Sequence, residues 1–82
     1  MIVREWTISK PYPHLVRVEH AHVLSGKAKI LVDGEWIYQR GSTLWDMGFE
    51  HRFELDGLPC IVRVLYRTWH YEYELWIDGK LQ

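Results

Sequence analysis

The 82-residue chain has little of several residue types and patterns on which common classes of site depend. A single cysteine excludes an internal disulfide framework and any cysteine-based zinc cluster. Ten basic and eleven acidic residues give a formal net charge of −1, which offers nothing to attract nucleic acid or an anionic membrane. No apolar run approaches the roughly 20 residues that span a bilayer, and no signal peptide is evident. We therefore expect a small cytoplasmic protein that binds neither nucleic acid nor membrane.

The chain does have regularly spaced turn signals. Asp-Gly occurs at 33–34, 56–57 and 78–79, each time between apolar or alternating runs. This pair strongly indicates a β-hairpin, because a type I′ turn needs positive φ at both central residues. Short strands with turns every 8–12 residues or so predict an all-β fold. The expected architecture is an antiparallel β-sandwich of two sheets, with about eight short strands and little or no helix, in a single domain of residues 1–82. The expected strands are 2–8, 15–19, 28–32, 35–40, 42–46, 49–55, 60–66 and 71–77.

Alternation and charge assign faces and register to the last strands. In 71–77 the two tyrosines, Leu75 and Ile77 form one set, which we expect in the core, and the acidic residues lie on the solvent side. A two-residue turn at 56–57 places Glu50 opposite Arg63, whereas a four-residue loop would place Arg52 there. Because like charges that face each other destabilise a sheet, we predict the two-residue turn. Glu74 opposite Arg63, or Glu72 opposite Arg67, would continue the pairing.

The candidates for chemistry all have plainer structural roles. His51 stands between two phenylalanines and is expected to be a core or half-buried histidine. His20 and His22 stand two apart, which is chelating geometry for zinc or copper on a strand, but two ligands alone do not make a site. Ser25 and Ser42 have no neighbouring base, no glycine-rich phosphate loop occurs, and Cys60 is expected to be buried and inert. We therefore predict no catalytic residue, no metal site and no cofactor.

Apolar bulk at outward-pointing positions is the unusual feature of the chain. The residues concerned are Leu31, Ile61, Leu65 and Trp76. If they are neighbours, they form a patch of the kind that marks a partner surface. Alternatively, the first segment of the chain, with Trp6, covers part of that face. The patch predicts binding of a protein partner or self-association.

The stretch "VLSGKAKILVDGEW…GSTLWDMGFEHRF" resembles a cupin barrel. The cupin metal positions carry over to His14, Glu19 and His51, while Tyr12 stands where the family has its first histidine. The resemblance implies, as an alternative function, a metal-dependent enzyme or a small-ligand binder that uses these three residues. A third possibility is a ligand cleft lined by aromatic side chains, Trp36, Tyr38 and Trp45.

A second set of motifs covers nearly the whole chain. It comprises "EH" at 19–20, "SGK" at 25–27, "VDG" at 32–34, "MGFEHRF" at 47–53 and "YEYELWIDGK" at 71–80. In order and spacing these resemble the Fas apoptotic inhibitory molecule family, and the last motif has no counterpart in cupins. The resemblance implies a β-sandwich of two four-stranded antiparallel sheets, with a regulatory or protein-binding role rather than catalysis. The founding members inhibit animal cell death and carry two such domains, so only the fold carries over to a single domain.

Overall fold

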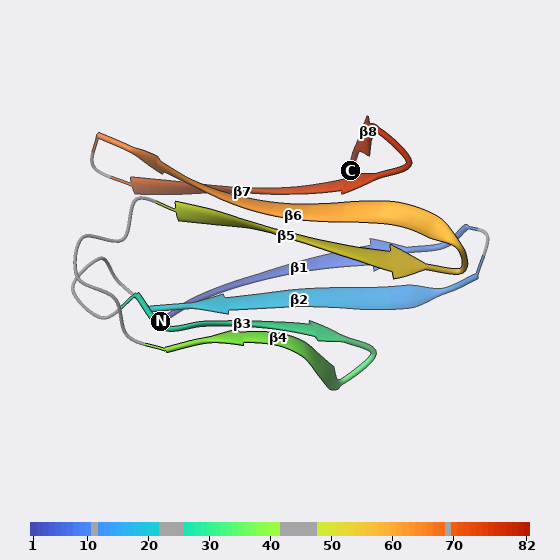
Figure 1. The fold of residues 1–82 in the computed structure, drawn as a ribbon, viewed down its shortest axis with the longest axis horizontal. Helices are drawn as coiled ribbons and strands as arrows, with labels where there is room; N and C mark the ends of the chain where they lie inside the picture. The colour runs from blue at the N-terminus through green and yellow to red at the C-terminus, as the bar shows by residue number, and fades with distance from the viewer. Residues whose placement is uncertain (11, 22–25, 42–47, 69) are drawn as a thin grey trace. The chain divides into compact units, whose positions relative to one another are not determined.

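The computed structural model describes residues 1–10, 12–21, 26–41, 48–68 and 70–82, which form two four-stranded antiparallel sheets (Figure 1). The first sheet contains β1 (Ile2–Ile8), β2 (His14–His20), β3 (Ala28–Val32) and β4 (Glu35–Arg40). The second contains β5 (Gly48–Leu55), β6 (Leu58–Arg67), β7 (His70–Ile77) and β8 (Lys80–Leu81). Strands follow chain order within each sheet. The predicted all-β fold with two antiparallel sheets is confirmed.

The two sheets belong to two compact units, residues 1–46 and 47–82. None of the described residues forms a helix of the length and apolar character needed to cross a membrane. The predicted strand 42–46 lies outside the described residues. The two-residue strand β8 was not predicted.

All three Asp-Gly pairs form the predicted two-residue turns. In each turn the aspartate has φ between 50° and 53°, and the glycine has φ between 76° and 84°. The residues that flank each pair face each other across the hairpin, as Leu55 and Leu58 do around 56–57. Positive φ at both central positions gives the twist that strands joined by a type I′ turn require. Local turn chemistry therefore sets the register of three hairpins.

The predicted register of the second sheet is confirmed. Glu50 lies opposite Arg63, and Arg63 lies opposite Glu74 on its other side. Of the two predicted β6–β7 alternatives, Glu74 opposite Arg63 is therefore found. Arg67 faces His70 instead of Glu72, but its Nε still lies 3.2 Å from Glu72 Oε2 along the diagonal.

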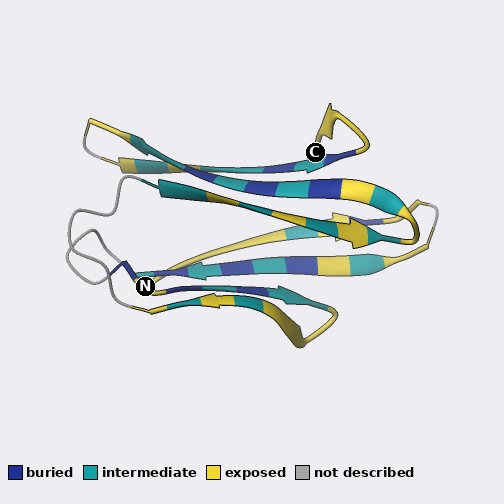
Figure 2. Cartoon of the chain, in the orientation of Figure 1, coloured by how far each residue is buried: buried dark blue, intermediate teal, exposed yellow. Residues whose placement is uncertain are grey.

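One face of the second sheet is buried, as alternation along β6 predicts (Figure 2). We call this the buried face. Its fully or almost fully buried residues are Cys60, Val62, Val64, Leu75 and Ile77. Tyr71 and Tyr73 are half-buried at the other end of β7, where the Tyr71 ring meets Tyr66 edge-on at 5.2 Å. The tyrosine, leucine and isoleucine set of β7 therefore shares one face, and its last two members are its most buried.

The first sheet buries a histidine among aliphatic side chains. Val16, Val18 and His20 alternate along β2 and are each 0% exposed. No buried side-chain nitrogen or oxygen among the described residues lacks a hydrogen-bond partner. Because burial of a polar group is costly only when it is unpaired, His20 serves here as a satisfied core residue. His22, its predicted chelating partner, lies outside the described residues.

Candidate partner-binding surface

We call the second sheet's other face, opposite the buried one, the open face. One row of residues crosses it in all four strands: Arg52 faces Ile61, Ile61 faces Trp76, and Trp76 faces Leu81. Directly opposed residues of an antiparallel pair project from the same side of a sheet. Three members of this row, Ile61, Trp76 and Leu81, form a continuous apolar line, which we call the apolar row. Leu81 is 56% exposed, and the other two are half-buried.

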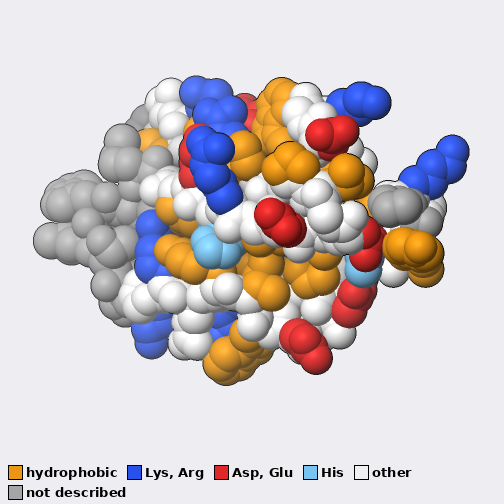
Figure 3. All heavy atoms as spheres, turned by 45° about the vertical axis from the view of Figure 1, so that its right-hand side comes forward, with side chains coloured by type: hydrophobic (Ala, Val, Ile, Leu, Met, Phe, Trp, Pro, Cys, Tyr) orange, Lys and Arg blue, Asp and Glu red, His pale blue; other side chains and the backbone are white. Residues whose placement is uncertain are grey.

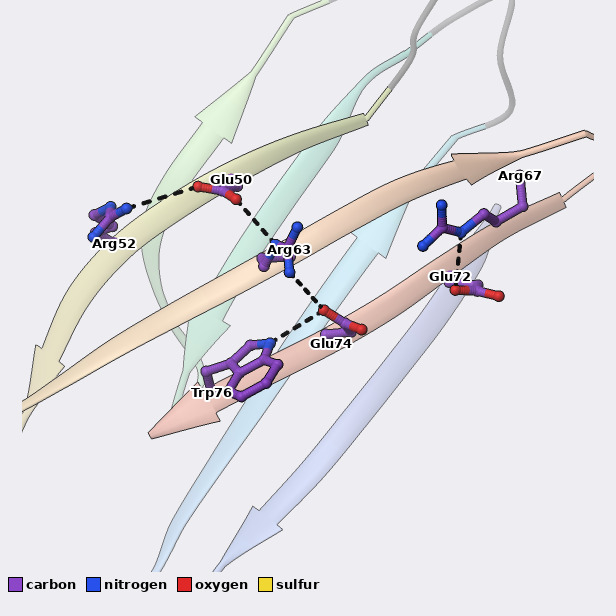
Figure 4. Close-up of polar contacts among 7 residues, drawn as sticks. All are labelled: Glu50, Arg52, Arg63, Arg67, Glu72, Glu74 and Trp76. Carbon is purple, nitrogen blue, oxygen red and sulfur yellow. Dashed lines mark hydrogen bonds and ion pairs between the residues drawn. The ribbon is translucent and has the colours of Figure 1, made fainter. Parts of the chain in front are cut away.

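A ladder of charges runs beside the apolar row (Figure 4). Arg63 Nε lies 3.0 Å from Glu50 Oε1, and Arg63 Nη1 lies 3.3 Å from Glu74 Oε1. The same Glu74 oxygen accepts a hydrogen bond of 3.1 Å from the indole N–H of Trp76. Part-exposed ion pairs of this kind contribute only about 0–1 kcal/mol each. Their main effect is positional, because the ladder ties the Trp76 ring to β7 and β6 in one orientation.

The structure brings together only part of the predicted surface. Ile61 and Trp76 are direct neighbours, whereas Leu65 lies four residues along β6, beyond Arg63, with Glu72 opposite. Leu31 belongs to the first sheet, where it faces Trp36. Leu81 was missed, although the Asp-Gly turn at 78–79 implies that it faces Trp76.

A hollow lies on the open face beside Ile61 and Trp76, two members of the apolar row. Its volume is about 610 Å³, within the range of roughly 300–1,000 Å³ found for ligand sites. Its apolar lining consists of Phe53, Pro59, Cys60, Ile61 and Trp76. Its charged lining consists of Glu50, Arg52, Glu54 and Arg63. Hydrophobic side chains reach the surface among acidic and basic groups, as Figure 3 illustrates. An apolar floor with charged edges is the composition expected of an interface.

The first sheet carries a separate exposed aromatic group. Trp36 is 60% exposed, and Lys29 Nζ lies 4.3 Å from the centre of its ring. A β-bulge at Ile30/Leu31 shifts the β3–β4 register, so Trp36 faces Leu31 while Tyr38 faces the buried Ile30. Successive strand residues project to opposite faces, so Trp36 and Tyr38 lie on opposite sides of this sheet. They do not share the cleft that the sequence suggested, and Trp45 lies outside the described residues.

Two of the carried-over cupin ligands lie on one strand but face opposite ways. His14 shares its face of β2 with the buried Val16, whereas Glu19 lies on the other face and accepts a 2.9 Å hydrogen bond from Arg17 Nε. Positions 14 and 19 are also about 17 Å apart along an extended strand. His51, the third, is half-buried on β5 and stacks on Phe53 at 6.2 Å. Among the described residues no group of three or more His, Cys, Asp or Glu side chains could hold a metal ion.

Burial shifts the pKa of two further residues that were candidates for chemistry, His51 and Cys60. Desolvation lowers the pKa of His51, because a partly buried ring favours the neutral form. Desolvation also raises the pKa of the Cys60 thiol, and Cys60 Sγ lies 3.5 Å from the carbonyl oxygen of Leu58. A buried thiol with a raised pKa is a poor nucleophile, which agrees with the inert role predicted for Cys60.

His14 instead ties the start of β2 to the β3–β4 turn. Its Nδ1 lies 2.6 Å from Asp33 Oδ2, and Asp33 Oδ1 accepts a 2.8 Å hydrogen bond from the Leu15 N–H. The His14 contact first, and then the Leu15 N–H, lower the pKa of Asp33 below its ordinary value of 3.8. The contribution of Asp33 to stability is therefore fully present above pH 3.8 and is lost as the pH falls through the depressed pKa.

Asp33→Asn is the variant that isolates this contribution. Asparagine tolerates the positive φ at this position and can still accept from Leu15, but it has no carboxylate charge. We expect the wild type to be more stable than Asp33→Asn at pH 6, and the difference to shrink as the pH falls below 3.8. Urea unfolding of both proteins at several pH values measures it. A difference that stays constant or grows on acidification would contradict the assignment.

Comparison with known proteins adds one finding. A family model for the Fas apoptotic inhibitory molecule matches residues 2–82, which is nearly the whole chain. No curated protein and no solved structure matches the chain.

Proposed function

The chain belongs to the Fas apoptotic inhibitory molecule family, and from this premise we propose that it is a non-catalytic module that binds a protein partner in the cytoplasm. The single observation that carries the proposal is the apolar row on the open face of the second sheet. Tryptophan is among the residues that most often dominate the energy of an interface. Here Trp76 stands at the centre of the row, between Ile61 and Leu81.

The charge ladder supports the proposal because it pre-organises the surface. The indole N–H of Trp76 is already satisfied by Glu74, which Arg63 holds in turn. A partner can therefore cover the ring without leaving a buried donor unpaired, and the ring does not need to be ordered on binding. Both effects reduce the cost of association at this position.

Substitutions in the apolar row test the proposal. Trp76→Asp and Leu81→Asp are expected to weaken partner capture by roughly 5- to 30-fold, which corresponds to a loss of about 1–2 kcal/mol of binding free energy. Leu81→Asp is the safer variant for folding, because Leu81 is exposed and lies on a two-residue edge strand. The matched control is Trp36→Asp, which removes an exposed tryptophan from the first sheet.

The measurement is capture from native cell extract by each immobilised variant, with circular dichroism to verify folding. Light scattering of the same variants detects self-association through the same surface. Equal capture by the wild type, Trp76→Asp and Leu81→Asp would overturn the assignment of this face. If only Trp36→Asp lost capture, the partner would bind to the first sheet instead. A stoichiometric transition metal in protein purified without a histidine tag would contradict the non-catalytic role.

A further inference from the structure

We propose that the hollow on the open face recognises an extended peptide segment in which a large apolar side chain is followed, two residues later, by lysine or arginine. This inference rests on the proposed function and names the chemistry of the partner. It follows from the charge and spacing of the groups next to the apolar row.

The row next to the apolar row is acidic. Glu54 faces Pro59 across the β5–β6 pair, and both line the hollow. Asp78 lies on the far side of Pro59, because its backbone N–H donates a 2.8 Å hydrogen bond to the Pro59 carbonyl oxygen. Two basic residues lie two positions from this row in sequence. Lys80 faces Ile77 and therefore lies on the other side of the sheet, whereas Arg52 shares the open face and its Nη2 lies 3.9 Å from Glu50 Oε2. We call Glu54, Pro59 and Asp78 the acidic row.

The other charges of the hollow are already compensated. Arg63 forms ion pairs with Glu50 and Glu74. The side chain of Arg52 is 76% exposed, and its Nη2 lies 3.9 Å from Glu50 Oε2. Glu54 is exposed, and its side chain has no hydrogen bond or ion pair with any described residue. Four carboxylates, those of Glu50, Glu54, Glu74 and Asp78, and the guanidinium groups of Arg52 and Arg63 surround the apolar row, which leaves two negative charges in excess. A ligand that complements this surface carries a positive charge at the acidic row.

The spacing of the two rows fixes the spacing of the ligand groups. Ile61 and Pro59 are two residues apart on β6, which corresponds to about 7 Å. Alternate side chains of an extended peptide project from one side with the same repeat. A leucine above Ile61 and Trp76 therefore places the side chain two residues away above the acidic row, where lysine or arginine meets Glu54. Such a segment contacts both the apolar side chains of Ile61 and Trp76 and the carboxylate of Glu54.

Capped peptides titrated into isotope-labelled protein provide the test. The probes are acetyl-Gly-Leu-Gly-Lys-Gly-amide, the same peptide with Glu for Lys, and the same peptide with Ala for Leu. The indole N–H signal of Trp76, assigned with Trp76→Phe, reports on the floor of the hollow. We expect the Leu/Lys peptide to shift this signal and to bind roughly two- to fivefold more tightly than the Leu/Glu peptide, the effect of one exposed ion pair. The Ala/Lys peptide should bind most weakly.

Variants of the acidic row complete the test. Glu54→Gln and Asp78→Asn are expected to remove the preference for lysine, and asparagine is compatible with the positive φ of Asp78. The matched control is Glu72→Gln, which lies on the same face beyond the charge ladder and should keep the preference. Equal binding of the Leu/Lys and Leu/Glu peptides, or no shift with any peptide, overturns the inference. If capture of a partner from extract still depends on Trp76 in that case, the proposed function stands without it.

Discussion

Gly48→Ala is expected to destabilise the protein by roughly 3–5 kcal/mol, because two separate costs fall on one added methyl group. Gly48 has φ of 103°, a conformation that residues with a Cβ rarely adopt. A Cβ at this position would stand 2.0 Å from the backbone carbonyl oxygen of Val64. Backbone atoms of a central strand cannot move aside as a flexible side chain can. A domain of this size has roughly 4–12 kcal/mol of stability, so this single methyl removes a large part of it.

Gly57→Ala is the matched control for this prediction. Gly57 also has positive φ and lies in the turn that joins β5 to β6, but a Cβ added there would meet nothing within 4 Å. Only the backbone strain remains, so the expected loss is roughly 1–2 kcal/mol. Urea unfolding followed by tryptophan fluorescence measures both variants. Equal losses for the two glycines would show that β5 and β6 do not approach each other closely at Gly48.

Leu75→Ala is expected to cost roughly 2–5 kcal/mol, because it leaves a cavity on the buried face of the second sheet. Leu75 is 0% exposed and faces Val62, which is equally buried. The matched control is Leu81→Ala, which removes the same atoms from a side chain that is 56% exposed. The free energy of unfolding of that variant should stay within about 1 kcal/mol of the wild-type value. A loss for Leu75→Ala as small as that for Leu81→Ala would mean that the core lies elsewhere.

Turn chemistry and period-2 alternation made most of the second sheet predictable from the sequence. Each Asp-Gly pair specifies a two-residue turn, and a turn of known length fixes which residues face each other. The opposition of Glu50 and Arg63 follows from that rule and from charge. The rule also places Leu81 opposite Trp76, yet β8 was not predicted, because two residues are too few to show alternation.

The first sheet was harder to predict because its irregular features have no sequence signal. The bulge in the β3–β4 pair inserts an extra residue without a glycine to mark it, and so reverses the expected sharing of a face by Trp36 and Tyr38. His20 was considered as a metal ligand from its spacing to His22. Extending the alternation of Val16 and Val18 by one step would have placed it in the core instead.

The alternation of side chains along a strand also does not show which of the two sheets the strand belongs to. Leu31 and Trp76 both occupy the face opposite the buried side chains of their own strands, and the sequence grouped them for that reason. The structure assigns them to different sheets. The contact of Trp76 with Glu74 joins residues two apart on one strand, and only a structure could show that these two side chains meet.

β6 and β7 divide their residues between a core face and an accessible face. A soluble gadolinium chelate, which broadens exposed methyl signals in NMR spectra, tests this division. We expect strong broadening for Leu81 and intermediate broadening for Ile61 and Leu65, while Val62, Val64 and Leu75 remain sharp. Sharp signals from Ile61 and Leu65, or broadened signals from Val62 and Leu75, would contradict it.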